Sequence, residues 1–253
     1  MRRALLTAFL LVTAPATQAE TIVASLSTSR VLISSNYTGS SVVVFGTIER
    51  DAQTIARANG YEVVMTVRGP RQTLIVREKQ RFGPIWVNRA EQRFPNVPAF
   101  LAVLSSAPIA EVTTEQLRQK LRVGLDAIVS SPTFSADRGT EDDPFRAALL
   151  RLENREGLYF QNERGVSFIT RTVFRAAVPV PATAPPGNYE VEIALFADDV
   201  LLSRAFTNFE LAKIGFEQQV GVLARDWSLL YGAATAGVAL LFGWLASVVF
   251  RRD

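Results

Sequence analysis

The densest group of side chains able to do chemistry is a basic stretch between residues 68 and 93. Its cations outnumber its carboxylates: they are Arg68, Arg71, Arg77, Lys79, Arg81, Arg89 and Arg93 against Glu78 and Glu91. Guanidinium groups hold oxyanions and phospholipid headgroups through paired N–H donors. The first five of these cations are therefore candidates for a small-oxyanion or headgroup site. The strand pattern favours the alternative, that they are solvent-facing positions on strands whose other face is apolar.

The composition excludes several classes of enzyme site. The chain has no cysteine and no histidine, which removes disulfides, thiol redox chemistry, Ser-His triads and the usual zinc and copper sites. The acidic run Glu141-Asp142-Asp143 precedes a predicted helix, where negative charge is favoured by the helix dipole without any calcium ion. We expect no cofactor and no metal.

Carboxylates remain as candidates for catalysis. A glycan hydrolase needs two acids about 5 to 10 Å apart in a cleft. Glu190 and Glu192 lie on one face of a predicted strand, a pattern typical of a solvated edge. We therefore expect a non-enzymatic protein without catalytic residues. The alternative is a carboxylate-dependent hydrolase acting on envelope glycans.

The elements that would position these residues are mostly strands. Short β-branched runs alternate with turn signals about every ten residues, which is typical of an antiparallel sandwich. The expected strands cover 30–34, 41–49, 61–68, 72–78, 158–161, 166–179, 189–196 and 200–211, with turns that include Gly69-Pro70 and Asp198-Asp199. Trp86, next to the Gly83-Pro84 turn, is expected in the core. The segment from Pro185 to Val191 is similar to the closing strands of immunoglobulin-like domains.

Two helices are expected between the β-rich parts. The first covers about 114–125, with Thr113 and Gln116 as a capping box. The second has Asp143 as its cap and Pro144 in its first position, and Phe145, Leu149 and Leu152 form its apolar stripe. The predicted fold is therefore mainly β: an immunoglobulin-like antiparallel β-sandwich, one composite or two, with a short α-helical insertion and one C-terminal transmembrane helix.

The two ends of the chain predict export and anchoring. Residues 1–19 have the charged, apolar and small-residue parts of a signal peptide. Residues 227–250 contain no charge over 24 positions, and at about 1.5 Å per residue this run reaches roughly 36 Å, enough for a bilayer core of about 30 Å. Arg251 and Arg252 follow it, so the positive-inside rule places the C-terminus in the cytoplasm. We expect a single-pass protein of the bacterial inner membrane with its bulk in the periplasm.

These boundaries give a linear plan of the chain. The expected parts are a signal peptide (1–19), an N-terminal β-rich part (20–110), a helical insertion (111–156), a C-terminal β-rich part (157–212), an amphipathic juxtamembrane segment (213–226), the span (227–250) and a cytoplasmic tail (251–253). The ends carry the whole net charge of +3, because residues 20–226 hold 23 basic and 23 acidic residues. An exported part without net charge gives no support for nucleic-acid binding.

Small residues follow one face of the expected span. They are Gly232, Ala236, Ala239, Gly243 and Ser247. Such a stripe lets a second helix approach closely. Besides the lipid bilayer, we therefore expect a polytopic membrane protein or a second copy of the chain as partner; the alternative is that small residues are simply common in spans.

Several segments resemble a known family. They are Tyr37-Thr38-Gly39, Val44-Phe45-Gly46, Val67-Arg68-Gly69-Pro70, Gly83-Pro84-Ile85-Trp86-Val87-Asn88, Pro186-Gly187-Asn188-Tyr189 and Lys213-Ile214-Gly215-Phe216-Glu217. With a signal peptide before and one span after them, nearly the full chain resembles the uncharacterised "putative transmembrane proteins" of alphaproteobacteria. This family has no established activity, so no catalytic residue follows from it. Its members are often encoded beside sulfite-exporter-like permeases, which implies an accessory or scaffold role beside such a permease or another envelope complex.

Overall fold

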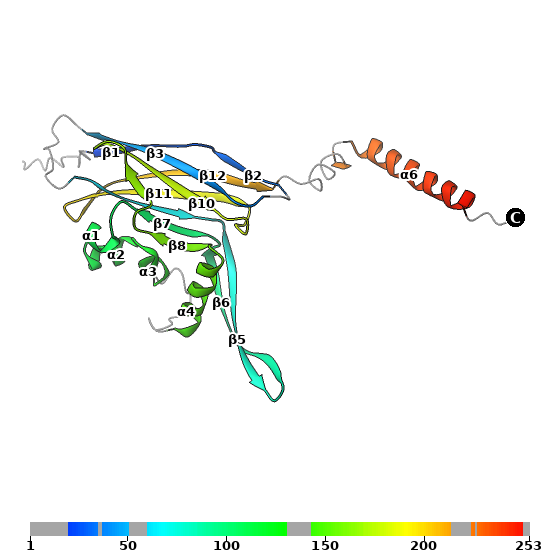
Figure 1. The fold of residues 1–253 in the computed structure, drawn as a ribbon, viewed down its shortest axis with the longest axis horizontal. Helices are drawn as coiled ribbons and strands as arrows, with labels where there is room; N and C mark the ends of the chain where they lie inside the picture. Colours follow the sequence, from blue (N-terminus) through cyan, green and yellow to red (C-terminus); the bar gives the residue numbers. More distant parts are fainter. Residues whose placement is uncertain are drawn as a thin grey trace, which may run out of the picture.

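The computed structural model describes residues 20–34, 37–50, 60–130, 143–213, 224–225 and 227–249. The expected signal peptide, Glu141-Asp142, most of the juxtamembrane segment and the tail lie outside these residues. Within them the chain is mainly β, as predicted, and its strands form three sheets with helices against one of them (Figure 1).

The first sheet is antiparallel and has the strand order β1-β3-β10-β9. Its strands are β1 (Glu20–Leu26), β3 (Ser40–Arg50), β10 (Val173–Val180) and β9 (Val166–Phe168). Burial alternates along β3 and β10, so that Val42, Val44 and Phe174 point into the core while their neighbours face solvent. This period of two is what the sequence pattern predicts for a half-buried sheet.

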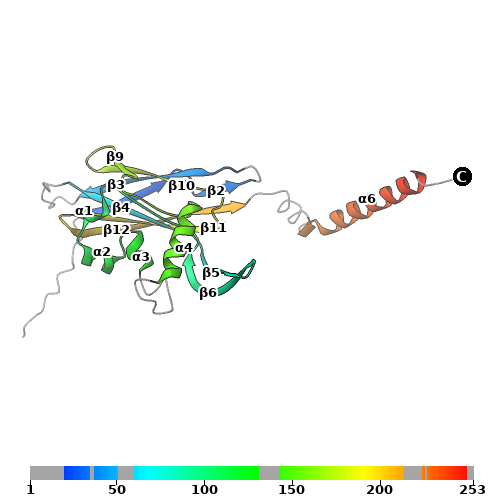
Figure 2. The ribbon, with the colours of Figure 1, turned by 60° about the horizontal axis from the view of Figure 1, so that its bottom comes forward.

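The second sheet has the order β2-β12-β11-β4-β7-β8. Its strands are β2 (Arg30–Ile33), β12 (Val200–Lys213), β11 (Gly187–Ala197), β4 (Glu62–Arg68), β7 (Leu101–Ser105) and β8 (Tyr159–Asn162). In β4 and β7 successive residues are buried, because helices lie against the outer face of this part of the sheet (Figure 2). These strands therefore lack the alternation of the first sheet.

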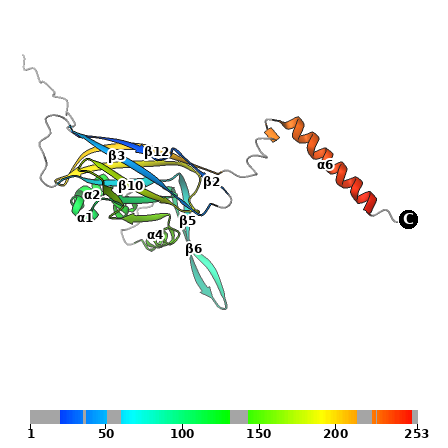
Figure 3. The ribbon, with the colours of Figure 1, turned by 45° about the horizontal axis from the view of Figure 1, so that its top comes forward.

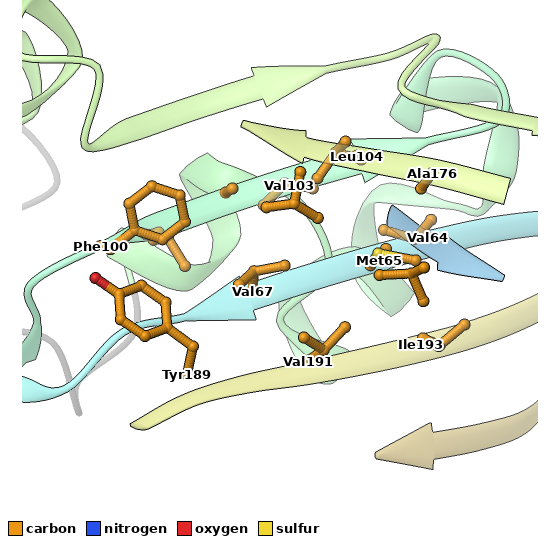
Figure 4. Packing of buried hydrophobic residues seen from close by; sticks show 14 of the residues in the cluster. Val64, Met65, Val67, Phe100, Val103, Leu104, Ala176, Tyr189, Val191 and Ile193 are labelled. Carbon is orange, nitrogen blue, oxygen red and sulfur yellow. The ribbon is translucent and has the colours of Figure 1, made fainter. Parts of the chain in front are cut away.

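Both sheets combine early and late strands of the chain. β3 pairs with β10, and β4 pairs with β11. The two β-rich parts that the sequence suggests are thus interleaved around one hydrophobic cluster, in which Val67, Phe100 and Tyr189 lie side by side (Figure 4). On one side β1 also lies beside β12, so the sheets curl toward each other like half a barrel.

A long two-stranded arm, formed by β5 (Arg71–Phe82) and β6 (Ile85–Pro98), leaves the two larger sheets (Figure 1). The expected turn at Gly69-Pro70 is wrong, because the β4–β7 ladder continues through it into the arm. Gly69 N–H donates to Phe100 O and Ala99 N–H donates to Pro70 O, both at 2.8 Å. A Cβ on Gly69 would lie 2.8 Å from the Phe100 Cβ, so glycine permits this close approach of the strands.

The first half of the helical insertion differs from the sequence prediction. Instead of one helix over 114–125, the chain forms α1 (Ile109–Val112), α2 (Glu115–Leu121) and α3 (Leu125–Val129). Arg122 adopts a left-handed conformation with φ of 55° and ends α2. The capping box is also wrong: the Thr113 hydroxyl donates to Asp199 O at 3.0 Å, a tertiary contact that replaces the local one.

The second predicted helix is confirmed as α4 (Pro144–Arg155). The Asp143 Oδ1 accepts from Phe145 N–H at 3.0 Å, and Pro144 occupies the first position. Its apolar stripe is shorter than expected, since Leu149 is buried but Leu152 is 46% exposed.

A helix, α6 (Ser228–Val249), also occupies the place where the sequence predicts a membrane span (Figure 3). Its described side chains are all exposed. Among the residues that the structure describes, no helix combines the length and the apolar character of a membrane span, so only the helix is confirmed.

Candidate functional site

An open cavity of about 380 Å³ lies at the root of the arm, where β4 passes into β5. Three cations, Arg68, Arg71 and Arg122, line it together with a single carboxylate, Glu190. The remaining polar lining comes from amide side chains, including Asn188. The excess of guanidinium groups suits a small oxyanion.

The wall of this cavity contains residues of two segments that carry the family resemblance, 67–70 and 186–189. The Gly187 backbone has a φ of 147°, and a Cβ there would meet the Pro70 ring at 3.0 Å. Tyr189 O–H donates to Pro185 O at 2.7 Å, and its ring stacks on Phe209 with centroids 5.0 Å apart. Burial, helped by the neighbouring Tyr37, raises the pKa of Tyr189 far above its ordinary value, so this hydroxyl stays a donor.

Arg68 is held by a carboxylate and is not open to an anion. Its Nη1 donates to Glu192 Oε2 at 2.7 Å, and the other Glu192 oxygen pairs with Arg204 Nη1 at 2.9 Å. The expectation that Glu192 lies on a solvated edge is therefore wrong, because its side chain is only 12% exposed. Arg204 also donates to Leu121 O at 3.4 Å, which joins the outer face of the sheet to the end of α2.

Sequence reasoning missed the Glu192–Arg204 contact, because the hairpin turn alone does not give the register on which it depends. The Asp198-Asp199 turn is confirmed, with φ of 50° and 63°, but an irregularity between Leu195 and Phe196 shifts the pairing, so that Glu192 faces Phe206. Arg204 is then the diagonal neighbour of Glu192, within reach of a long side chain. Sequence reasoning missed Arg122 as well, because its position depends on where α2 ends.

The other two arginines of the cavity have freer side chains. Both are exposed, and Arg71 Nη1 makes one long hydrogen bond, 3.3 Å, to Asn96 O. Arg122 sits in the left-handed turn after α2. Both line the root cavity, so Arg71 and Arg122 are the groups that could hold an anion here, and the negative charge of Glu190 weakens the attraction.

The remaining predicted contacts lie on the arm, away from the cavity. Arg77 pairs with Glu91 at 3.2 Å, and Glu91 also pairs with Arg93 at 3.4 Å. The hydrogen bonds from Arg77 and then Arg93 lower the pKa of Glu91. Arg81 Nε donates to Gly83 O at 3.0 Å, and Lys79 has no carboxylate partner among the described residues. The basic stretch is thus split between two places, which the sequence could not separate.

Trp86 is 67% exposed near the tip of the arm, so its predicted place in the core is wrong. It pairs across the hairpin with Arg81 in a two-stranded sheet that no other element covers at this end. The turn next to it, Gly83-Pro84, is confirmed.

The carboxylates of the cavities do not come in pairs. The root cavity has Glu190, and a more open cavity of about 630 Å³ beside β2 and β12 has Glu210, which pairs with Arg30 at 2.8 Å. Neither of these two cavities supplies the acid pair that a glycan hydrolase needs. Within the described part of the chain, no three acidic residues come together as a metal site.

The small residues of α6 keep an open face. Gly232, Ala236, Ala239, Gly243 and Ser247 are exposed, and no described atom lies within 4 Å of a Cβ built on Gly232 or Gly243. Nothing in the described residues occupies the space that a second helix would take.

Comparison with protein families matches residues 21–252 to the family described as "putative transmembrane protein" (Alph_Pro_TM). No curated protein matches the chain. The match includes the strands that build the root cavity, the arm and α6, and it confirms the resemblance seen in the sequence. Because it covers almost the whole chain, the protein belongs to this family, whose function is unknown.

Proposed function

We propose that the protein is a non-enzymatic accessory or scaffold protein of the bacterial inner membrane. Residues 227–250 hold an immunoglobulin-like sandwich on the periplasmic side, and the C-terminus is cytoplasmic. The observation that carries the proposal is the apolar surface of α6: Leu229, Leu240 and Trp244 are 89%, 76% and 65% exposed. Apolar surface on this scale is unfavourable in water and favourable in lipid. The uncharged run and the family description support the same placement.

The strand order supports the immunoglobulin-like assignment. The orders β1-β3-β10-β9 and β12-β11-β4 correspond to strands A-B-E-D and G-F-C of that fold. Tyr189 near the start of β11 donates to a backbone oxygen four residues upstream, as the tyrosine corner of such domains does. The arm and the helices are then insertions on either side of β7.

The partner in this proposal is a membrane protein that packs on the small-residue face of α6. It is either a second copy of the chain or a polytopic protein, such as a sulfite-exporter-like permease. An accessory role fits a chain that offers binding surfaces, the root cavity and the arm, and brings no pair of acids together in either cavity.

The topology can be tested because the chain has no cysteine. Single cysteines replace exposed Thr183 or follow Asp253, and spheroplasts are treated with a membrane-impermeant maleimide. We expect labelling at residue 183 in intact spheroplasts and labelling of the C-terminal cysteine only after lysis. Labelling of the C-terminal cysteine from outside would overturn the proposed topology.

A further inference from the structure

We propose that the tip of the β5–β6 arm binds an anionic phospholipid bilayer. Phe82, Ile85 and Trp86 enter the interfacial region, and the cations behind them contact lipid phosphates. The inference rests on the proposed function only for the identity of the membrane that the arm meets. The attraction between the arm and lipid is argued from the side chains of the arm alone.

The tip exposes large apolar side chains where the hairpin reverses. Phe82, Ile85 and Trp86 are 74%, 56% and 67% exposed. Isolated exposed apolar residues are common, but three large ones within five positions form a patch that favours a nonaqueous environment. Tryptophan in particular is enriched where membrane meets water.

The patch surrounds the tip and does not lie on one side of it. Phe82 pairs with Ile85, and the next pair, Arg81 with Trp86, points to the opposite face of the hairpin. A hairpin that docks flat on a protein needs apolar residues on one face only. Apolar residues on both faces at the end, and polar ones behind them, fit insertion of the tip into a layer.

The charges behind the tip match the headgroups of such a layer. Residues 77–93 contain five cations and two carboxylates, and both oxygens of Glu91 are already taken by Arg77 and Arg93. Lys79, Arg81 and Arg89 have no carboxylate partner among the described residues. Basic residues next to an apolar, aromatic end are the pattern of interfacial binding to anionic lipid.

The root of the arm is fixed, so the tip is presented at a distance from the sandwich. Val76 and Phe94 are 5% and 0% exposed, and Gln92 Nε2 donates to Asp143 Oδ2 at 2.9 Å. From Val76 to Phe82 the strand extends roughly 20 Å at about 3.3 Å per residue. The views in Figures 1 and 3 agree that the arm leaves the body, with no other element beside its tip.

The test uses the full chain with Trp227→Phe and Trp244→Phe, which leaves Trp86 as the sole tryptophan. The protein is reconstituted into nanodiscs of phosphatidylcholine alone or with phosphatidylglycerol, each with and without brominated acyl chains. We expect a blue shift of Trp86 emission and at least about twofold quenching by the brominated lipid in the anionic discs, weakened by added salt. Emission at the wavelength of water-exposed tryptophan in both lipids would overturn the inference.

A charge-reversed variant and its matched control locate the effect. Lys79→Glu, Arg81→Glu and Arg89→Glu together should abolish the quenching. Lys120→Glu, Arg151→Glu and Arg155→Glu change net charge equally on exposed helix positions and should preserve it. Equal quenching in neutral and anionic discs contradicts the anionic requirement. A blue shift without quenching shows burial against protein and also overturns the proposal.

The same samples separate this inference from the proposed function. Flotation with neutral phosphatidylcholine at high salt reports on residues 227–250, whereas quenching in anionic lipid reports on Trp86. A chain that floats with neutral lipid and has an unquenched Trp86 in anionic lipid rejects the arm and leaves the anchor intact. A chain that does not float with neutral lipid but is quenched on addition of anionic vesicles rejects the anchor and supports the arm.

Discussion

Arginines of one stretch of sequence have different surroundings and therefore different roles. Arg68 and Glu192 are 22% and 12% exposed, and Arg204 shares the same carboxylate. Water screens the attraction among these three side chains weakly, and loss of one arginine leaves the partly buried Glu192 carboxylate with a single partner. Arg77 and Glu91 are 53% and 44% exposed, so their attraction is screened. The Arg68–Glu192 ion pair therefore stabilises the fold, whereas the Arg77–Glu91 pair contributes little to the free energy of unfolding.

This contrast predicts unequal effects of two alanine substitutions. Arg68→Ala should lower the free energy of unfolding by about 1–2 kcal/mol, because Glu192 keeps only Arg204. Arg77→Ala should cost less than about 0.5 kcal/mol. Urea denaturation of the full chain in mild detergent, followed by circular dichroism, measures both. Equal losses would show that Arg68 is no better shielded than Arg77.

Glu153 gives a pH-dependent prediction. Burial, followed by repulsion from Glu156, raises its pKa above the ordinary 4.5, and its Oε2 has no hydrogen-bond partner among the described residues. The folded state then holds this proton more tightly than the unfolded state. Stability is therefore lost as the pH rises from about the unfolded pKa through the folded one.

Glu153→Gln removes this ionisation and should raise the melting temperature at pH 7. The gain should vanish below about pH 4, where both states of the wild-type carboxyl are protonated. Glu49→Gln, at an exposed position of β3, is the control and should change little at either pH. An equal rise in melting temperature at pH 4 and pH 7 would show that the ionisation of Glu153 is not its cause.

At the scale of elements, the local sequence pattern predicted which segments form strands, helices and turns better than it predicted where those segments lie in the fold. Runs of β-branched residues found most of the strands but missed β1, β6 and β7, whereas Asp143-Pro144 found the start of α4 and Asp198-Asp199 found a hairpin. The errors share a cause, since each depends on which segments meet in space. Gly69-Pro70 continues a ladder because Phe100 lies opposite, and Trp86 is exposed because nothing covers the tip. The arginines of the root cavity and of the arm likewise looked like one cluster until the hairpin separated them.

Asp143 links two elements and so predicts a joint effect. One carboxylate oxygen caps α4 and the other accepts from Gln92 on the arm. Asp143→Ala should cost about 1–2 kcal/mol of stability. In hydrogen exchange, it should speed exchange both in the first turn of α4 and in β6 around Gln92.

Gln92→Ala separates the two contributions. It removes only the link to the arm, so exchange should rise in β6 while the first turn of α4 keeps its protection. Unchanged exchange in β6 for both variants would mean that the buried Val76 and Phe94 alone fix the root of the arm.

At the scale of the whole molecule, the two larger sheets and α6 differ in where they place their apolar residues. The two sheets enclose them, and they do so only when β10–β12 have joined β3 and β4, more than 100 positions earlier in the chain. Such long-range pairing makes folding slow. α6 instead keeps every described side chain exposed, so none of the described residues covers it.

The small-residue face of α6 therefore predicts a position-specific crosslink. A photoreactive residue at Ala239 should give crosslinked products in native membranes, because a neighbouring helix can approach closely there. Gly243→Leu places a large side chain one turn away and should reduce these products roughly fivefold, the equivalent of about 1 kcal/mol of packing. Leu241→Phe, on the opposite face, adds bulk without blocking the approach and should leave them unchanged. A product of twice the chain's mass identifies a second copy and any other mass a different protein, whereas equal effects of the two substitutions would show that the small residues form no packing face.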